Sequence, residues 1–262
     1  MTRSPNGSME TNPMLLIVNA DDLGASQAVN DEIFELMDAG LVTSATLMAN
    51  GPAFQDAVRR VRQFPHCSFG VHLNLTSFRP LSDPGELKPI LKDGEFCLEL
   101  LTKKALRELR KAVERELMMQ VQKVADAGVP VTHLDSHHFI HLRPALFPVI
   151  KTVQRHFGIR RVRSSREAMA KSGVKRLQFR VMDFALRNLY ATITPNGWCE
   201  FRKFHAQLVH HGVPHFRSLE LMVHPGSQNR AFAEEIALLR TDWRTTLPAS
   251  VKIGSYHLLN AA

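Results

Sequence analysis

The sequence has few cysteines and no long hydrophobic run, and both absences narrow the possible functions. Its three cysteines, Cys67, Cys97 and Cys199, are odd in number and form no C-x-x-C pair. This pattern argues against a disulfide framework and a cysteine zinc site, and it is typical of a reducing compartment. No run of about 18 apolar residues occurs, so no transmembrane helix is expected. Residues 1–13 are polar and lack the apolar core of a signal peptide, so we expect a flexible tail and a cytoplasmic protein.

Positive charge is concentrated in one segment. The chain of 262 residues carries a net charge of +8, and residues 151–190 alone contain eleven Lys or Arg against two acidic residues. The remainder is therefore close to neutral, which suggests either a local patch for an anionic partner or a solvated helical face. No nucleic-acid-binding motif accompanies these residues, and stacking aromatics are not interleaved with them. We therefore expect no nucleic-acid partner.

Short apolar runs alternate with helical patterns along most of the chain. This alternation predicts parallel strands, because each crossover brings the chain back to the same side of a sheet. With about seven strands, we expect an α/β fold, an open or distorted (β/α) barrel in a single domain over residues 14–262. Residues 75–99 predict a long loop near the site, and residues 164–193 predict a basic helical insertion. The predicted strands are 14–18, 45–49, 69–73, 129–134, 159–163, 198–201 and 219–223, and the predicted helices are 27–39, 106–127 and 231–239.

Polar side chains that can bind metal or transfer protons fall at the ends of the predicted strands. In β/α barrels the C-terminal ends of the strands carry the chemistry. The residues at or just past these ends are Asp21, Asp22, Asn50, His72, Asp135, His137 and His224. Neutral imidazole and carboxylate are ordinary ligands of divalent metals, so their shared placement predicts one metal-centred site.

The densest cluster is HLDSHHFIH at residues 133–141, with four histidines and one aspartate in nine positions. Alternation along a strand places His133 and Asp135 on one face, with His137 just beyond the strand end. This predicts His137 as a metal ligand and Asp135 as a group that orients an imidazole. The alternative is a surface histidine cluster, which seldom follows a buried strand.

Three further positions have both a functional and a structural interpretation. Asp21 and Asp22 leave a strand in different directions, so one can bind metal while the other acts as a general base. The alternative is a helix N-cap. His72 is either a ligand or a core histidine, and His224 is either a proton donor to a leaving amine or an inert turn residue.

Together these motifs resemble the YdjC-like carbohydrate deacetylases, which include the chitooligosaccharide deacetylases (YdjC/ChbG). The matching motifs are Asn-Ala-Asp-Asp-x-Gly, Gly-x-His-x-x-Leu-Thr, His-Leu-Asp-Ser-His and a final His-Pro, in this order between Leu15 and Leu258. The resemblance implies a distorted β/α barrel that hydrolyses the acetamido group of an N-acetylated sugar or oligosaccharide. The products would be acetate and an amino sugar.

The resemblance also implies roles for individual residues. Asp22, His72 and His137 would hold one divalent metal ion, such as Mg²⁺ or Zn²⁺. Asp21 would be the general base and His224 a general acid.

One position departs from the family pattern, which usually reads His-x-Asp-x-His-x-His-x-His. This chain has Phe139 at the penultimate histidine position. A phenyl ring there changes the pocket wall and the substrate preference that the resemblance implies. His138 is expected to point elsewhere on an extended chain. The residues predicted to line the substrate site are Asn50, Asn74, Asp135, Phe139 and His141.

Two other functions fit parts of the sequence. A phosphoesterase is the first, although two-metal phosphoesterases usually need more bridging carboxylates than this cluster supplies. The second is a protein that contacts an anionic glycan or membrane surface through residues 171–190, where apolar residues at helical spacing are flanked by Lys and Arg. The sequence does not indicate the oligomeric state, and a homodimer is one option.

Overall fold

The main sheet is built from parallel strands whose C-terminal ends lie at one end of the molecule. The computed structural model describes residues 13–169, 181, 183–188 and 192–260. The strands of this sheet are β1 (Met14–Leu23), β2 (Ser44–Leu47), β3 (Ser68–Leu73), β6 (Val131–Ser136), β7 (Arg161–Val162), β8 (Gly197–Glu200), β9 (Ser218–Val223) and β10 (Val251–Gly254). Their order is β7-β6-β3-β2-β1-β9-β8, with β10 beside β1, and all these pairings are parallel.

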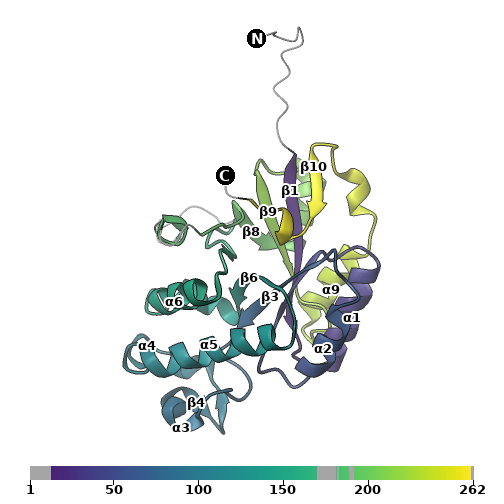
Figure 1. Ribbon diagram of the computed structural model, residues 1–262. Coiled ribbons are helices and arrows are strands. Elements are labelled where there is room, and N and C mark those ends of the chain that lie inside the picture. Colours follow the sequence, from purple (N-terminus) through teal and green to yellow (C-terminus); the bar gives the residue numbers. More distant parts are fainter. Residues whose placement is uncertain (1–12, 170–180, 182, 189–191, 261–262) are drawn as a thin grey trace.

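Strand β10, which was not predicted, shares one edge of β1 with β2. Residues Met14 to Ile17 of β1 pair with β10, and the second half of β1 pairs with β2. Strand β9 lies along the opposite edge. The C-terminal segment therefore returns beside the first strand, as Figure 1 shows.

The sheet curls until its two edges meet. Strand β7 is bridged to Ile193, and the chain just beyond β7 is bridged to β8 through Glu167 and Trp198. The backbone N–H of Trp198 donates to the Arg166 carbonyl at 2.9 Å, and the Ala168 N–H donates to the Trp198 carbonyl at 2.8 Å. These isolated bridges replace a full ladder at the seam, so the prediction of a distorted parallel barrel is confirmed.

The two faces of the strands differ in polarity, because successive side chains on a strand point to opposite faces. On β1, Leu16, Val18 and Ala20 belong to the large hydrophobic core, whereas Asn19 and Asp21 face the barrel interior. Other core residues on these strands are Phe69, Val71, Leu73, Leu134, Leu219, Leu221 and Val223. Other buried polar residues on them are Ser44, Thr46, Ser68, His72, His133, Asp135 and Glu220.

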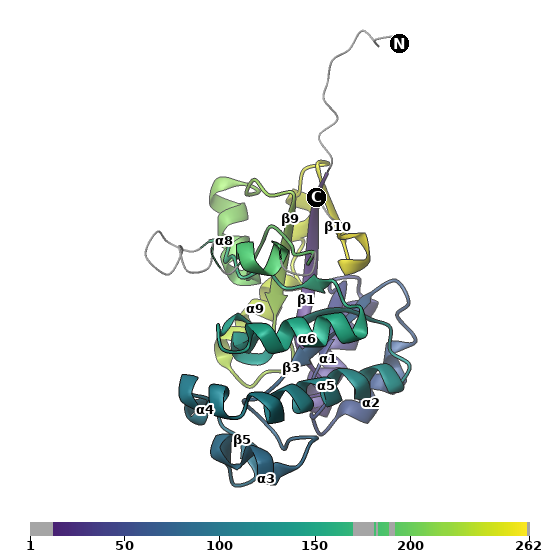
Figure 2. The same cartoon turned by 60° about the vertical axis from the view of Figure 1, so that its left-hand side comes forward.

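Helices surround the outer face of the sheet (Figures 1 and 2). They are α1 (Gln27–Asp38), α2 (Phe54–Val61), α3 (Pro84–Leu87), α4 (Lys103–Glu108), α5 (Arg110–Asp126), α6 (Phe147–Phe157), α8 (Phe201–His211) and α9 (Arg230–Leu239). Helix α1 follows its prediction closely. It begins after Ser26, whose hydroxyl accepts from the Val29 N–H at 3.2 Å, and it is followed by Gly40 at φ +66°.

Two predicted segments differ from the structure. The helix predicted over 106–127 is divided into α4 and α5, because Leu109 has φ −93° and ψ 11°, outside the helical range. The loop predicted over 75–99 contains α3 and a small antiparallel hairpin of β4 (Leu91–Lys92) and β5 (Glu95–Phe96). Short 3₁₀ segments complete the chain: η1 (Lys88–Ile90), η2 (Leu98–Leu100), η3 (His137–Leu142), η4 (Trp243–Thr246) and η5 (Tyr256–Leu258).

Much of the predicted basic insertion over 164–193 lies outside the described residues. Within it the structure describes 164–169, 181, 183–188 and 192–193, and residues 183–188 are helical. Leu186 in this helix is buried, while Val181 and Phe184 are 63% and 69% exposed. Across the described part of the chain, no helix combines the length and apolar character needed to cross a membrane.

Candidate active site

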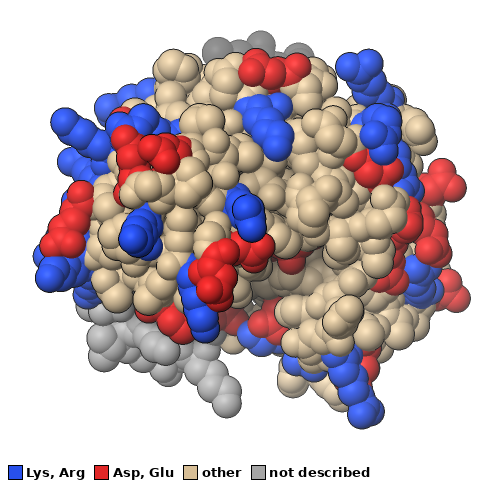
Figure 3. Space-filling model, turned by 90° about the horizontal axis from the view of Figure 1, so that it is seen from below, with Lys and Arg blue, Asp and Glu red and all other residues tan. Residues whose placement is uncertain are grey.

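The polar residues predicted at the strand ends gather at one end of the barrel. Asp21 and Asp22 end β1, His72 lies near the end of β3, Asp135 lies on β6, and His224 directly follows β9. Figure 3 views the molecule from this end and shows a hollow near the middle of the face. The site therefore occupies the C-terminal mouth of the barrel, where β/α barrels place their chemistry.

Asp22 turns away from its neighbour because the backbone is irregular at this point. Its φ is +68°, and the pairing of β1 with β2 shifts register between Ala20 and Leu23. The turn brings the Asp22 Oδ1 atom to 3.3 Å from His72 Nε2 and 3.9 Å from His137 Nε2. This oxygen is buried and has no hydrogen-bond partner among the described residues. A buried carboxylate oxygen within 4 Å of two imidazole nitrogens fits a metal-ligand set.

His72 is oriented by a carboxylate behind it. Its Nδ1–H donates to Asp135 Oδ1 at 2.7 Å, and this leaves Nε2 directed toward Asp22. Burial alone would lower the pKa of His72, but Asp135 and Asp21 raise it to about 10. The carboxylates thus create a negative potential that favours a cation at this point, either a proton on Nε2 or a divalent metal.

His137 is held by a hydroxyl that the sequence analysis did not identify. The Thr76 hydroxyl donates to Asn74 Oδ1 at 3.1 Å, so it accepts from His137 Nδ1–H, which lies 2.7 Å away. Burial lowers the pKa of His137 to about 4. The ring is therefore neutral, with its Nε2 lone pair free to bind a metal.

Arg163 is the central residue that sequence reasoning missed. It is fully buried and lies between three carboxylates, with Nη2 at 2.6 Å from Asp21, 2.9 Å from Asp135 and 2.7 Å from Glu220. Its position at the end of the strand predicted over 159–163 offered the same signal that identified the other site residues. In the sequence, Arg163 stands among the eleven Lys and Arg residues of the basic segment over 151–190, which conceals its role.

Arg163 holds Asp21 in its ionised form. Burial would raise the pKa of Asp21, but the two hydrogen bonds from the guanidinium, to Oδ2 at 2.8 Å and to Oδ1 at 2.6 Å, hold it well below its usual range. Asn19 also donates to Asp21 Oδ1 at 2.9 Å. This carboxylate is fixed in direction and negatively charged.

The described residues contain two overlapping sets that could hold a metal ion. One is Asp22, His72 and His137, and the other is Asp21, His72 and Asp135, whose ligand atoms lie within 4.8 Å of one another. In the second set both carboxylates already bind Arg163, and His72 would have to use the nitrogen that binds Asp135 or turn its ring. In the first set, Asp22 Oδ1 lies 3.3 Å from His72 Nε2 and 3.9 Å from His137 Nε2, on the ring nitrogen of His72 that does not bind Asp135.

His224 lies beside Asp21. Its Nε2 is 3.8 Å from Asp21 Oδ2, and its ring stacks on Phe232 with centroids 4.2 Å apart. Its Nδ1 is buried and finds no hydrogen-bond partner within the described part of the chain. The imidazole therefore borders the same space as the Asp21 carboxylate.

Three ring side chains, Phe139, His141 and Trp198, lie close together and are called the aromatic wall here. Phe139 stacks on Trp198 with ring centroids 4.6 Å apart, and His141 lies 6.3 Å from Phe139. The Trp198 Nε1 and His141 Nε2 atoms are both buried, and neither has a hydrogen-bond partner in the described residues. Burial lowers the pKa of His141 to about 3, so its ring is neutral.

The chain at this wall is not extended, which corrects the expectation for His138. His138 and Phe139 have φ of 50° and 53°, in the left-handed region that aromatic residues rarely adopt. The turn brings the His138 ring to 4.0 Å from the His137 ring and its Nδ1 to 3.1 Å from the Thr76 hydroxyl. His138 therefore stays beside the site.

Asn50 and Asn74 hold a loop next to the site. Asn50 donates to the carbonyls of Ser77 and Arg79 at 3.1 and 3.0 Å, and Asn74 donates to Asn50 Oδ1 at 3.0 Å. Their polar atoms are thus engaged in fixing residues 74–79. Asp135 is likewise fully buried against His72 and Arg163. That these three residues contact substrate stays a prediction.

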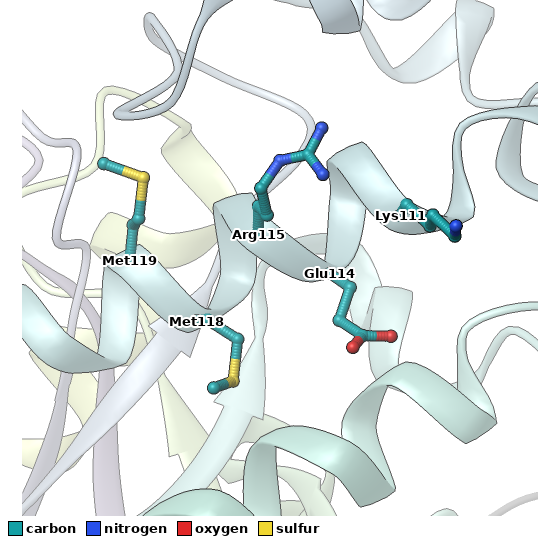
Figure 4. Close-up of a pocket in the computed structure, with 5 residues that line it drawn as sticks. All are labelled: Lys111, Glu114, Arg115, Met118 and Met119. Atoms are coloured by element: carbon teal, nitrogen blue, oxygen red, sulfur yellow. The ribbon is translucent and has the colours of Figure 1, made fainter.

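A second hollow lies against α5 (Figure 4). Its lining has mixed charge, and Arg115 pairs with Glu86 of α3. The residues that line it are Lys111, Glu114, Arg115, Met118 and Met119. None of them belongs to the site described above.

Comparisons with known proteins identify the family of this chain. The model of the YdjC-like protein family matches residues 15–247. A carbohydrate deacetylase from Geobacillus stearothermophilus is 41% identical over 157 residues, which cover 59% of this chain and 62% of that protein. A chitooligosaccharide deacetylase from Serratia marcescens is 35% identical over 147 residues, covering 55% of this chain and 57% of that protein. The matched regions thus span less than two thirds of these relatives.

A solved structure shares the fold over nearly the whole chain. It is a protein from Enterococcus faecalis V583, provisionally named a cellobiose-phosphate cleavage protein, with a TM-score of 0.73 at 20% sequence identity. The match covers 94% of this chain and 98% of that one. Because the family model extends over residues 15–247, most of its length, this chain belongs to the YdjC-like protein family.

Proposed function

We propose that this protein is a metal-dependent carbohydrate deacetylase, which hydrolyses the acetamido group of an N-acetylated sugar to acetate and an amino sugar. The observation that carries the proposal is the unpaired, buried Asp22 Oδ1 facing His72 and His137, directly beside an Asp21 carboxylate that Arg163 keeps ionised. Relatives named carbohydrate deacetylase and chitooligosaccharide deacetylase support the same reaction.

Asp22 Oδ1, His72 Nε2 and His137 Nε2 would hold the metal. A divalent ion bound there would supply Lewis-acid activation of the acetamide carbonyl and of water. Of the two ions that the sequence suggests, two imidazole nitrogens and one carboxylate suit Zn²⁺ better than Mg²⁺, which prefers oxygen ligands.

Asp21 and His224 divide the proton transfers. Asp21 accepts a proton from water as the water attacks the acetamide carbon, and Arg163 keeps the carboxylate ionised and directed for this step. His224 donates a proton to the nitrogen of the leaving amine. Their 3.8 Å separation allows both groups to reach one substrate from the same side.

The aromatic wall would bind the sugar ring. Phe139 offers an apolar ring, and Trp198 stacks on it. Since the family pattern has histidine at position 139, the phenyl ring would shift the preference toward a sugar with a less polar group at this point. The three cysteines are unpaired, which suits a cytoplasmic enzyme.

The test is acetate release from a panel of N-acetylated sugars, with and without added Zn²⁺ or Mg²⁺. Asp21→Asn should reduce kcat by at least about 100-fold, the usual contribution of a general base. Asp126→Asn, an exposed carboxylate on α5, serves as the matched control and should leave the rate unchanged. Folded, metal-loaded wild type that releases no acetate from any sugar would overturn the proposal.

Metal binding provides an independent readout. Zn²⁺ should raise the melting temperature of the wild type, because a ligand that binds only the folded state stabilises it. Asp22→Asn should weaken Zn²⁺ affinity by at least about tenfold, as for ligand-shell changes in zinc sites. If Asp135→Asn weakens binding far more than Asp22→Asn does, the other donor set holds the ion.

Contact with an anionic surface is a second, separate proposal. It is supported by two exposed apolar side chains, Phe184 in the helix at 183–188 and Val181 just before that helix. Replacing both with Ser should reduce binding to anionic liposomes, and unchanged binding would contradict it.

A further inference from the structure

The C-terminal segment inserts Tyr256 into the barrel, beneath the candidate active site. Tyr256 lies in η5 just after β10 and is fully buried. Its ring stacks on His133 with centroids 3.7 Å apart, and its hydroxyl donates to Glu220 Oε2 at 2.5 Å. This residue lies beyond residue 247, where the match to the family model ends.

Glu220 connects Tyr256 to the base. Its other oxygen, Oε1, accepts from Arg163 Nε at 2.8 Å and lies 2.7 Å from Nη2, on the edge of the guanidinium that adjoins the two bonds to Asp21. A continuous path of hydrogen bonds therefore runs from the Tyr256 hydroxyl through Glu220 and Arg163 to both oxygens of Asp21. All four residues are at most 2% exposed.

We propose that Tyr256 is a positioning residue for Asp21, acting through Glu220 and Arg163. This inference rests on the proposed role of Asp21 as general base. Glu220 Oε1 binds the Nε and Nη2 edge of Arg163, and together with the contact between Nη2 and Asp135 this sets the direction in which the guanidinium presents its N–H pair to Asp21.

The hydroxyl group of Tyr256 supports Glu220 in two ways. It gives a buried carboxylate oxygen its donor, without which that oxygen would be unpaired. Its hydrogen bond also lowers the pKa of Glu220, which burial raises overall despite the opposing effects of Arg163 and Tyr256. A protonated or rotated Glu220 would weaken its bond to Arg163 and free the guanidinium to turn.

Only the hydroxyl oxygen is required for this role. A phenylalanine at position 256 would keep the stacking on His133 and the packing against Ile17 and Leu259. Tyr256→Phe therefore separates positioning from filling the barrel.

The test compares Tyr256→Phe with Leu259→Ala in the metal-loaded enzyme. Leu259 is 4% exposed in the same small cluster and makes no side-chain hydrogen bond, so its truncation lowers stability without touching the path. Tyr256→Phe should lower kcat by about tenfold with KM and Zn²⁺ affinity unchanged. Leu259→Ala should leave kcat per folded molecule unchanged. Equal kcat in the two variants would overturn the proposal.

A double-mutant cycle tests the route. If Tyr256 acts through Glu220, Tyr256→Phe should have little further effect on kcat once Glu220→Gln is present. Independent, multiplicative losses would show that Tyr256 does not act through Glu220 and would overturn the proposal.

A second double-mutant cycle, measured by protein stability, distinguishes failure of this inference from failure of the deacetylase proposal. If wild type releases no acetate, the proposed function is wrong, but the hydrogen-bonded path from Tyr256 to Asp21 can still be tested by urea unfolding. The cycle of Tyr256→Phe with Asp21→Asn should show coupled losses of stability if the path connects the two residues. Additive losses would overturn the connection.

Discussion

The inner and outer faces of the sheet are held together by different interactions, although they belong to the same strands. On β9, Leu221 faces outward and packs in the hydrophobic core, while Glu220 faces inward and binds Arg163 and Tyr256. The outer face gains stability from apolar area removed from water. The inner face depends on every charge and donor finding a partner, because an unpaired buried charge is costly.

Two buried carboxylates show the same contrast. Asp21 on the inner face has Arg163 beside it, which overcomes the effect of burial and lowers its pKa. Among the described residues, Glu235 on α9 accepts a hydrogen bond only from the Arg202 N–H, at 3.1 Å, and burial raises its pKa to about 7. The direction of a pKa shift therefore depends on the balance between burial and the neighbouring charges, since Arg163 outweighs burial at Asp21 but not at Glu220.

Removal of the buried Arg163 cation from the inner face should have the largest effect on the free energy of unfolding. Arg163→Met would leave Asp21, Asp135 and Glu220 buried together without their shared partner, and it should lower the free energy of unfolding by about 3–5 kcal/mol or more. Arg161→Met is the control. Arg161 lies two residues earlier, and its side chain donates to the Leu259 carbonyl at 2.9 Å, so its replacement should cost about 1 kcal/mol. Similar losses in urea unfolding would refute the central role of Arg163.

A truncation on the outer face should cost stability without changing chemistry. Leu221→Ala would leave a cavity in the core and should lower the free energy of unfolding by about 3 kcal/mol. Zn²⁺ affinity and acetate release per folded molecule should remain those of the wild type. Leu100→Ala, at a site 38% exposed, should change stability by less than about 0.5 kcal/mol. A changed rate in Leu221→Ala would show that the two faces are not independent.

The smallest expected effect on stability comes from the Glu235 carboxyl group on α9, and it depends on pH. The pKa of Glu235 is raised from 4.5 to about 7 in the folded protein, so its stabilising contribution is complete below pH 4.5 and is lost as pH rises through 7. Glu235→Gln should remove this dependence and make the variant about 2 kcal/mol more stable than wild type at pH 8, with little difference at pH 4.5.

Urea unfolding at the two pH values measures the Glu235 effect. Glu234→Gln, at a neighbouring side chain that is 54% exposed, is the control and should show no such difference. If both variants respond equally, the effect does not arise from burial of Glu235.

Much of the candidate site could be predicted from local sequence. The run ending in Asp21 and Asp22, the histidine on β3 and the cluster at 133–141 each follow an apolar strand, and strands of one parallel sheet end together. Thr76 belongs to the Gly-x-His-x-x-Leu-Thr motif, but its contact with His137 was missed because nothing local in the sequence links residues 61 positions apart. Phe139 stood out by its departure from the family pattern, but its left-handed backbone could not be predicted, because tertiary contacts hold it there.

The sequence by itself determined the alternation of strands and helices, the side of each strand that is apolar, and the ligand-type residues at the strand ends. These follow from periods of two and 3.6 residues, which are local. The closure of the barrel by isolated bridges, the return of β10 beside β1, and the placement of Arg163 among three carboxylates were decided only by the tertiary structure. Arg163 and Asp21 are 142 positions apart, and a charge that looks like surface basicity in the sequence becomes the buried partner of Asp21 only when the sheet curls.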